Sequence, residues 1–395
     1  MSELFRRTFA EINLDHLAHN FFEIQKVAGI ERFLCPMVKA NGYGHGDIQI
    51  AKHLEKCGVE NLGVCLIEEG LLLRKSGVQA DILVFRGFDK YGAQKILDHH
   101  MTPVVSTWDQ IHCLESIADD AVNVHLKFNT GMNRLGFDPD QAELLFAYFK
   151  NSKKLKLKAI LSHFFNGEDA YLENGESKKQ TDQMESLLNF FRPLNVFAHL
   201  LNSGGIASLA KINNVSKIES NHYLQKNNWG FRPGLILYGY QPKDIFSELN
   251  LKPVMSLKSV VNNIRDVKKG ESVSYGAKWI AEKDSKIAVV PIGYADGVHR
   301  MLSNKNQALF AGNLVPIVGR ICMDFLMLDV TDVILQNNTQ NKKYDDEEVV
   351  LFGYDQAGQF LSAEKAAEAA QSITWEMLTS VGERVPRLFK GGAEL

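Results

Sequence analysis

The sequence has few of the features that mark secreted, zinc-binding or nucleic-acid-binding proteins. Its five cysteines are odd in number and include no Cys-x-x-Cys pair, which argues against a disulfide framework and a structural zinc site. The 44 Lys and Arg residues against 47 Asp and Glu give a net charge of −3, without the basic excess that attracts nucleic acid. Since 45% of the residues are hydrophobic, a packed core is expected. With these classes excluded, we expect a globular protein that binds a small molecule and no metal.

Long hydrophobic runs are also missing. The first residues, MSELFRRTFAEINLDHL, reach Glu11 and Asp15 without the apolar stretch that a signal peptide requires. No later uncharged run is long enough to span a bilayer. We therefore expect a cytoplasmic protein that does not bind a membrane.

Short apolar runs alternate with longer amphipathic segments between about residues 33 and 237. The runs are 33–38, 62–66, 82–85, 103–105, 122–126, 157–161, 196–200 and 235–237, and the segments between them include 47–57, 107–118, 140–150 and 178–191. This alternation predicts a parallel sheet covered by helices. Eight such units favour an α/β fold of the (β/α)8 TIM barrel type, with an open doubly wound sheet as the alternative.

The pattern changes after about residue 245. Apolar runs at 254–261, 287–290, 315–318 and 348–351 are separated by turns rich in Gly, Asn and Asp, which predicts a mostly antiparallel β domain. The polar stretch 336–346 is interpreted as an exposed loop within that domain. We thus expect a barrel at residues 10–245 and a β domain at 246–395. Whether residues 1–9 pack with the second domain is open at this stage.

A lysine at the end of the first predicted strand is the strongest candidate for chemistry. Lys39 begins the segment KANGYGHG, and catalytic groups of such barrels lie at the carboxyl ends of strands. Glycine-containing turns at 201–205 and 231–235 follow the seventh strand and lie near the eighth, where these barrels commonly bind phosphate. A lysine facing a phosphate site suggests pyridoxal 5'-phosphate held as a Schiff base. Without that context, a surface lysine beside a turn is an equally good reading.

Eight motifs occur in a fixed order along the chain: KANGYGHG (39–46), NTGMNRLG (129–136), SHF (162–164), NS (202–203), RPG (232–234), SYGA (274–277), GYADG (293–297) and GRICMD (319–324). With these motifs the sequence resembles the alanine racemases over nearly its whole length. The resemblance implies a fold-type III pyridoxal-phosphate enzyme that interconverts L-alanine and D-alanine. It also implies a homodimer with shared active sites and a role in supplying D-alanine for peptidoglycan.

Two bases of opposite stereochemical access are the simplest route to racemisation. By resemblance these are Lys39 and Tyr275. Lowering a phenol pKa from about 10 by about three units requires roughly 4 kcal/mol, which nearby positive charge would supply. The resemblance implies that His163 links Tyr275 to Arg232, and that Arg232 faces the pyridine nitrogen. Because an arginine is a permanent donor, that nitrogen should stay unprotonated.

The resemblance implies further roles for other residues. Arg134 is expected to contact the substrate carboxylate or the phenolate oxygen of the cofactor, and Met323 is expected to bind the same carboxylate. Lys127 stands where many family members carry a carbamylated lysine that orients this arginine, and the sequence leaves the modification open. The remaining expected roles are cofactor binding, chiefly at the phosphate, by Tyr43, Ser203, Gly234, Leu235 and Trp375, and an entry channel formed by Tyr294, Arg300 and Asp324.

Three departures from the family pattern stand out. Trp375 occupies the place of a tyrosine, and an indole has one donor and greater bulk. Residues 165–168 replace small residues and an aspartate near the expected entrance. Lys278 stands three residues after Tyr275, where an inward orientation would lower the tyrosine pKa and an outward one would have no effect.

Three other functions are alternatives to an alanine-specific racemase. A broader alanine and serine racemase is compatible with all the motifs. A fold-type III amino-acid decarboxylase is disfavoured, because such enzymes pair the pyridine nitrogen with a carboxylate where this chain has Arg232. A single-domain cofactor carrier lacks the β domain and therefore the second base, Tyr275.

Overall fold

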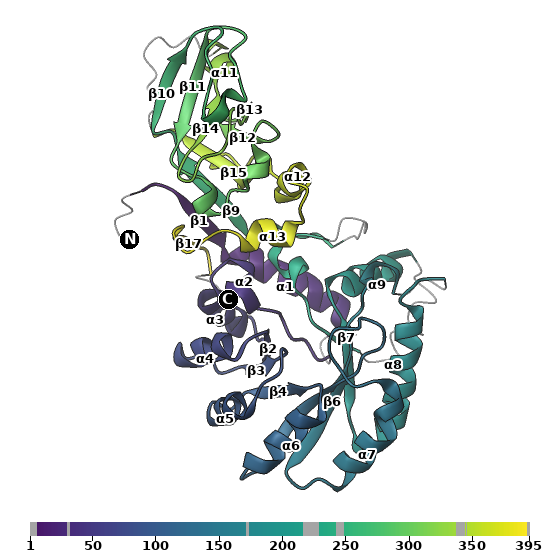
Figure 1. Ribbon diagram of the computed structural model, residues 1–395. Coiled ribbons are helices and arrows are strands. Elements are labelled where there is room, and N and C mark those ends of the chain that lie inside the picture. Colours follow the sequence, from purple (N-terminus) through teal and green to yellow (C-terminus); the bar gives the residue numbers. More distant parts are fainter. Residues whose placement is uncertain are drawn as a thin grey trace. The chain divides into compact units, whose positions relative to one another are not determined.

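The computed structural model describes residues 6–29, 32–170, 174–215, 229–241, 249–336, 344 and 346–392, with only the backbone at 212–215. The chain divides into two compact units (Figure 1). The barrel unit comprises His16–Gly42 and Asp47–Lys252, and the β unit comprises Met1–Asp15, Tyr43–Gly46 and Pro253–Glu394. Most of the polar stretch predicted as a loop at 336–346 lies outside the described residues.

Seven parallel strands form the sheet of the barrel unit, in the order β2-β3-β4-β5-β6-β7-β8. They are β2 (Asn61–Val64), β3 (Asp81–Val84), β4 (Thr102–Val105), β5 (Val122–Lys127), β6 (Leu155–Leu161), β7 (Phe197–Leu201) and β8 (Gly230–Phe231). The segment before Lys39 joins the two edges of this sheet, because Leu34 bridges Phe231 and Met37 bridges Gly63, both in parallel. The (β/α)8 class predicted from the alternation is confirmed.

Two of the eight predicted strands were wrong in detail. The run 33–38 is no continuous strand but makes isolated bridges, since Pro36 has no N–H to donate to a ladder. The run 235–237 is a 3-10 helix, η4 (Leu235–Tyr238), and the eighth strand is β8, which ends before Pro233. Proline removes a ladder donor and fixes φ, so the strand cannot continue through it.

Helices surround these strands (Figure 1). They are α1 (Leu14–Ala28), α2 (Lys39–Tyr43), α3 (Asp47–Lys56), α4 (Ile67–Lys75), α5 (Lys90–Asp98), α6 (Trp108–Ile117), η1 (Pro139–Gln141), α7 (Ala142–Asn151), η2 (Gly167–Asp169), α8 (Lys178–Phe191), η3 (Arg192–Leu194) and α9 (Ser203–Val215). Caps at Asp89 and Thr107 accept hydrogen bonds from the amides of Gly92 and Gln110, which fixes where α5 and α6 begin. None of the described helices is both long and apolar enough to cross a membrane.

The described residues of the β unit form two sheets. The larger has the order β13-β12-β15-β9-β1-β17 with β16 paired to β15, and the smaller has the order β10-β11-β14. The strands are β1 (Phe9–Asn13), β9 (Met255–Val260), β10 (Asn263–Val267), β11 (Ser285–Val290), β12 (Gln307–Phe310), β13 (Asn313–Pro316), β14 (Leu326–Asp329), β15 (Glu348–Tyr354), β16 (Phe360–Leu361) and β17 (Arg387–Lys390). Short helices are η5 (Tyr275–Ala277), η6 (Tyr294–Asp296), η7 (Arg300–Leu302), α11 (Thr331–Gln336), α12 (Ala363–Ala369) and α13 (Thr374–Thr379).

The pairings of the β unit are antiparallel except between β1 and β17, so the predicted mostly antiparallel character is confirmed. Strand β1 comes from the start of the chain and lies between β9 and β17. Val273, Ile287, Val318 and Met327 form an apolar cluster on the smaller sheet, and the partly buried Trp279 and Cys322 pack against it.

Candidate active site

The residues singled out from the sequence fall into two groups, one in each unit. The barrel unit carries Lys39, Lys127, Arg134, His163, Ser203, Arg232, Gly234 and Leu235. The β unit carries Tyr43, Tyr275, Tyr294, Arg300, Met323, Asp324 and Trp375. Each group is described within its own unit.

Lys39 is followed by a left-handed turn of the backbone. Ala40, Asn41, Gly42 and Tyr43 have φ values of 52°, 54°, 59° and 53°. Left-handed helical geometry costs roughly 1–2 kcal/mol per residue other than glycine, so hydrogen bonds must hold the turn. The Gly42 amide donates to the Val38 carbonyl at 2.9 Å, and the Ala40 amide donates to the Glu69 carboxylate at 2.7 Å. Lys39 is thereby attached to a rigid turn, directly after the segment that joins the two edges of the sheet.

Glu69 was missed by sequence reasoning. Its Oε2 also accepts hydrogen bonds from the amides of Cys65 and Leu66, at 2.8 and 2.9 Å. These amides precede α4, and Glu69 is the third residue of that helix, where an acidic side chain reaches back to the cap. The capping position could have been read from the sequence, whereas the bond to Ala40 could not.

Arg232 is buried, and both of its terminal nitrogens form hydrogen bonds. Its Nη1 donates to His199 Nδ1 at 2.7 Å and to the His199 carbonyl at 2.6 Å, and its Nη2 donates to the Ser162 carbonyl at 2.6 Å. The expected bond from Nη2 to His163 Nδ1 is present at 3.4 Å. Burial lowers the pKa of Arg232 to about 10, so the guanidinium stays protonated at neutral pH. His199 was not singled out beforehand, since a histidine in the apolar run FAHLL looks like an ordinary core residue.

Positive charge dominates the electrostatics of this group. Burial, then the charges of Arg232 and Arg134, hold the pKa of His163 well below its usual value, so its ring is neutral. Burial and the same two arginines lower the pKa of Lys127 to about 8, with Lys39 adding to the effect. A site that destabilises its own cations in this way favours an anion.

The loop with Arg134 starts directly after Lys127 and is pinned at both ends. The Phe137 amide donates to the Lys127 carbonyl at 2.9 Å, and the Asn129 amide donates to the Phe137 carbonyl at 2.8 Å. The side chain of Arg134 is exposed and forms no hydrogen bond or ion pair within the described part of the chain. Its guanidinium is therefore available to an external anionic group.

Ser203 is the first residue of α9 and accepts hydrogen bonds from the segment after β8. Its Oγ accepts from the Gly234 amide at 3.1 Å and from the Ile236 amide at 3.5 Å. A Cβ on Gly204 would lie 3.2 Å from the backbone of Gly167, so the two backbones pack closely here. Backbone amides, a hydroxyl and a helix N-terminus converge here, as phosphate sites require. The structure thus brings Ser203 next to Gly234 and to the start of η4, which begins at Leu235.

Tyr275 lies on the surface of the β unit, with 70% of its side chain exposed. Its turn is strained, because Ser274 and Ala277 have φ values of 66° and 46°. The turn is anchored by a bond of 2.6 Å from Ser274 Oγ to the Arg320 carbonyl. Lys278, whose orientation was open, is exposed.

Three of the motifs are adjacent in the β unit. The amides of Tyr294 and Ala295 each donate at 3.0 Å, to the carbonyls of Cys322 and Met323 respectively. Since Ser274 also bonds the Arg320 backbone, the turns 274–277, 293–297 and 320–324 form one surface. Met323 and Tyr294 are 53% and 43% exposed on it. Arg300, in η7, is also exposed.

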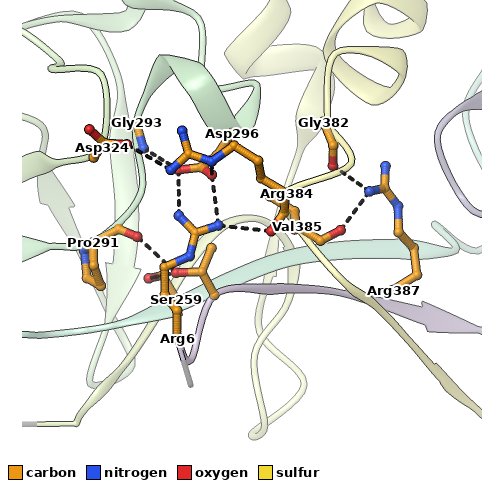
Figure 2. A network of polar contacts seen from close by, with 11 residues as sticks. Arg6, Ser259, Pro291, Gly293, Asp296, Asp324, Gly382, Arg384, Val385 and Arg387 are labelled. Carbon is orange, nitrogen blue, oxygen red and sulfur yellow. Dashed lines mark hydrogen bonds and ion pairs between the residues drawn. The ribbon is translucent and has the colours of Figure 1, made fainter. Parts of the chain in front are cut away.

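A network of ion pairs supports this surface (Figure 2). Asp296 is fully buried and accepts two hydrogen bonds from Arg6, at 2.9 and 2.8 Å, and one from the Gly293 amide at 3.0 Å. Arg384 lies 3.6 Å from Asp296 and donates to Asp324 at 2.8 Å. The expected channel residue Asp324 is thus ion-paired, and Asp296 fixes the turn that carries Tyr294.

Tyr43 and Trp375 are the last two candidate residues of the β unit. Tyr43 is buried, and Trp375 is half-buried in α13. A Cβ on Gly44 would come within 2.2 Å of the Leu378 carbonyl, so α13 packs directly on the backbone beside Tyr43. The φ of Gly44, 83°, also requires glycine.

Comparison with known proteins assigns both units. The family described as "Alanine racemase, N-terminal domain" matches residues 12–242, and "Alanine racemase, C-terminal domain" matches residues 254–389. The chain is 34% identical to alanine racemase 2 of Caldanaerobacter subterraneus subsp. tengcongensis, over 98% of this chain and 96% of that protein. It is 32% identical to the alanine racemase of Halothermothrix orenii, over 98% and 97%.

Solved structures give the same result. The alanine racemase of Clostridium difficile 630 superposes with a TM-score of 0.85 at 29% identity, covering 98% of this chain and 97% of that one. The alanine racemase of Streptomyces lavendulae superposes with a TM-score of 0.86 at 27% identity, covering 99% of each chain.

Proposed function

Because the chain belongs to the alanine racemase family of enzymes, we propose that it interconverts L-alanine and D-alanine with pyridoxal 5'-phosphate and two bases. The observation that carries the proposal is the group of candidate residues in the barrel unit, here called the barrel group. A lysine on a left-handed turn, a buried arginine, and a serine hydroxyl with neighbouring backbone amides at a helix N-terminus occur together in one unit. The further proposals below concern cofactor, substrate, assembly and role.

The donor set of the barrel unit fits the proposed cofactor. Lys39 would hold it covalently, Ser203 and the backbone at Gly234 and Leu235 would bind its phosphate, and Arg232 would face its ring nitrogen. Tyr43 and Trp375 are the proposed further contacts. When bound, pyridoxal phosphate supplies an electron sink that acidifies the α-hydrogen of an amino acid. Since Arg232 stays charged and only donates, it limits the strength of that sink and hence the side reactions.

The two proposed bases are Lys39 and Tyr275. The amine of Lys39 accepts or returns the α-proton on the D-face, and the phenolate of Tyr275 does so on the L-face. His163, neutral and bonded to Arg232 through Nδ1, carries its hydrogen on Nε2 and is proposed to link Tyr275 to Arg232. A base that is 70% exposed is poorly suited to proton transfer until another surface excludes water from it.

A homodimer with shared active sites would supply that surface. The turns around Tyr275 expose Met323, Phe325 and Tyr294 by 53%, 41% and 43%, which is an apolar face suited to cover by a second copy. In this arrangement Tyr275 and Met323 of one subunit complete the barrel group of the other. Tyr294, Arg300 and Asp324 would then border the entry channel.

Arg134 and the amide of Met323 are the proposed ligands of the substrate carboxylate. The exposed guanidinium of Arg134 suits an anionic oxygen pair. Lys127, whose pKa is about 8, is neutral often enough near neutral pH to react with carbon dioxide. The resulting carbamate would place an anion next to Arg134 and orient it.

Incubation of the purified protein with L-alanine, followed by chiral separation of the products, tests the activity. We expect D-alanine to accumulate to equal amounts, and a failure to form it with the cofactor supplied would overturn the proposal. L-serine tests for the broader racemase, and release of carbon dioxide would indicate the decarboxylase.

We assign the D-alanine to peptidoglycan synthesis in the cytoplasm, which is tested by D-alanine auxotrophy of a strain lacking the gene.

A further inference from the structure

Arg232 is linked by successive hydrogen bonds to two buried histidines, His199 and His125. His199 Nδ1 lies 2.7 Å from Arg232 Nη1, and His199 Nε2 lies 2.9 Å from His125 Nδ1. His199 is on β7 and His125 on β5, with β6 between these strands. Since the two rings meet across an intervening strand, both point to the interior of the barrel.

Aromatic rings enclose this pair. The ring centroids of Phe33 and Phe197 lie 5.8 and 5.7 Å from that of His125, and Phe33 lies 4.9 Å from His199. His125 and His199 are 4% and 0% exposed. Water has little access to either ring, so each polar atom depends on its protein partner.

The donors of Arg232 determine the tautomer of both rings. A guanidinium only donates, so His199 Nδ1 must accept and its hydrogen must be on Nε2. That hydrogen is donated to His125 Nδ1, which therefore accepts as well. The hydrogen of His125 is then on Nε2. Burial and the charge of Arg232 lower the pKa of His125 to about 3, which keeps it neutral as this arrangement demands.

We propose that His125 is a positioning residue for Arg232, acting through His199. By accepting the hydrogen of His199 Nε2, it holds the His199 ring in the one tautomer and orientation that can accept from Arg232 Nη1. Without this acceptor, the buried N–H at His199 Nε2 would have no hydrogen-bond partner. A rotation of the ring that moved this N–H elsewhere would turn it toward the guanidinium, which only donates. The inference rests on the proposed function, since it is the Arg232 guanidinium whose direction matters there.

A matched pair of variants tests the acceptor itself. His125→Asn places an amide oxygen close to the position of Nδ1, and His125→Leu has nearly the same shape as asparagine but no acceptor. We expect His125→Leu to lower kcat for alanine about tenfold with KM changed less than about twofold, because the lost bond orients and does not bind substrate. His125→Asn should recover most of that loss. His112→Leu, at an exposed histidine, is the control and should match wild type.

Nitrogen-15 NMR of histidine-labelled protein gives a readout independent of turnover. In wild-type holoenzyme, His199 should show an accepting Nδ1 and a protonated Nε2, and His125→Leu should shift both signals while His125→Asn leaves them nearly unchanged. A wild-type His199 protonated on Nδ1 would overturn the inference even if His125→Leu fails to fold.

The remaining outcomes are distinct. Equal losses in His125→Leu and His125→Asn would assign the residue to packing and overturn the proposal, as would full activity in both. Wild-type protein without racemase activity would overturn the proposed function, and with it the reason to position Arg232. Active wild-type enzyme with unaffected variants would overturn only the inference.

Discussion

The carboxylate of Glu69 accepts a hydrogen bond of 2.7 Å from the amide of Ala40, the residue directly after Lys39. The same carboxylate holds the amides of Cys65 and Leu66 at the start of α4. One side chain therefore fixes both a helix end and the left-handed turn beside the proposed cofactor lysine. A link of this kind makes the position of Lys39 depend on a residue that takes no part in the chemistry.

Glu69→Ala should destabilise the protein by about 2 kcal/mol, because three backbone donors lose their acceptor. It should also weaken cofactor retention, seen as a loss of visible absorbance during dialysis. Urea unfolding measures the first effect. Glu68→Ala is the matched control, since Glu68 is exposed in the same helical turn, and its effect should stay within about 0.5 kcal/mol. Equal effects of the two variants would contradict the assigned role.

Arg232→Glu should let the ring nitrogen of the cofactor carry a proton, because a carboxylate stabilises the charged form that arginine opposes. We expect racemisation to fall and the side reaction to pyruvate and pyridoxamine phosphate to rise. Both products are measurable by chromatography after incubation with L-alanine. If racemisation falls but neither product increases, Arg232 does not face that nitrogen.

Hybrid dimers test the shared active site. Lys39→Ala and Tyr275→Phe should each be nearly inactive alone. After joint dissociation and random reassociation, about half of the dimers are hybrids, each with one doubly altered and one intact site. Roughly a quarter of wild-type activity should return. Tagged hybrids that form without regaining activity would mean that both bases come from one chain.

The lowered pKa of Lys127 predicts a pH-dependent stability difference. A base whose pKa falls from 10.5 to about 8 on folding opposes folding fully below pH 8, by roughly 3 kcal/mol, and less as the pH rises toward 10.5. In carbon-dioxide-free buffer, Lys127→Met should therefore be more stable than wild type at pH 7, with the gap closing by pH 10.5. Denaturant titrations across this range measure it.

Bicarbonate extends this test to the carbamate. It should stabilise wild-type protein at pH 8 and give a carbamate signal with carbon-13 label, because the carbamate replaces the buried cation with an anion and removes the penalty. Lys127→Met should respond to neither. A stability gap that is constant with pH would mean that Lys127 is not the group responsible.

Local patterns in the sequence determined much of this protein. The helix predicted at 178–191 is α8 with the same bounds, and the alternation of apolar runs and amphipathic segments determined the barrel class. The motifs singled out Ser203 and the segment 232–235, which the structure brings together through the bond from the Gly234 amide to Ser203 Oγ. These features depend on hydrophobic periodicity, on proline and glycine, and on short spacings, all of which are readable along the chain.

Tertiary structure alone decided which residues surround Arg232 and Lys39. His125 and His199 are 74 positions apart, and Glu69 is 29 positions from Ala40, so no local pattern connects them. Each histidine lies in an apolar strand, where a core residue and a polar relay look alike in sequence. Strand β8 likewise could not be placed from hydrophobicity, because two residues are too few to show a period. The physical reason is common to all three: hydrogen bonds between segments far apart in the sequence form only after the chain has folded and excluded water from them.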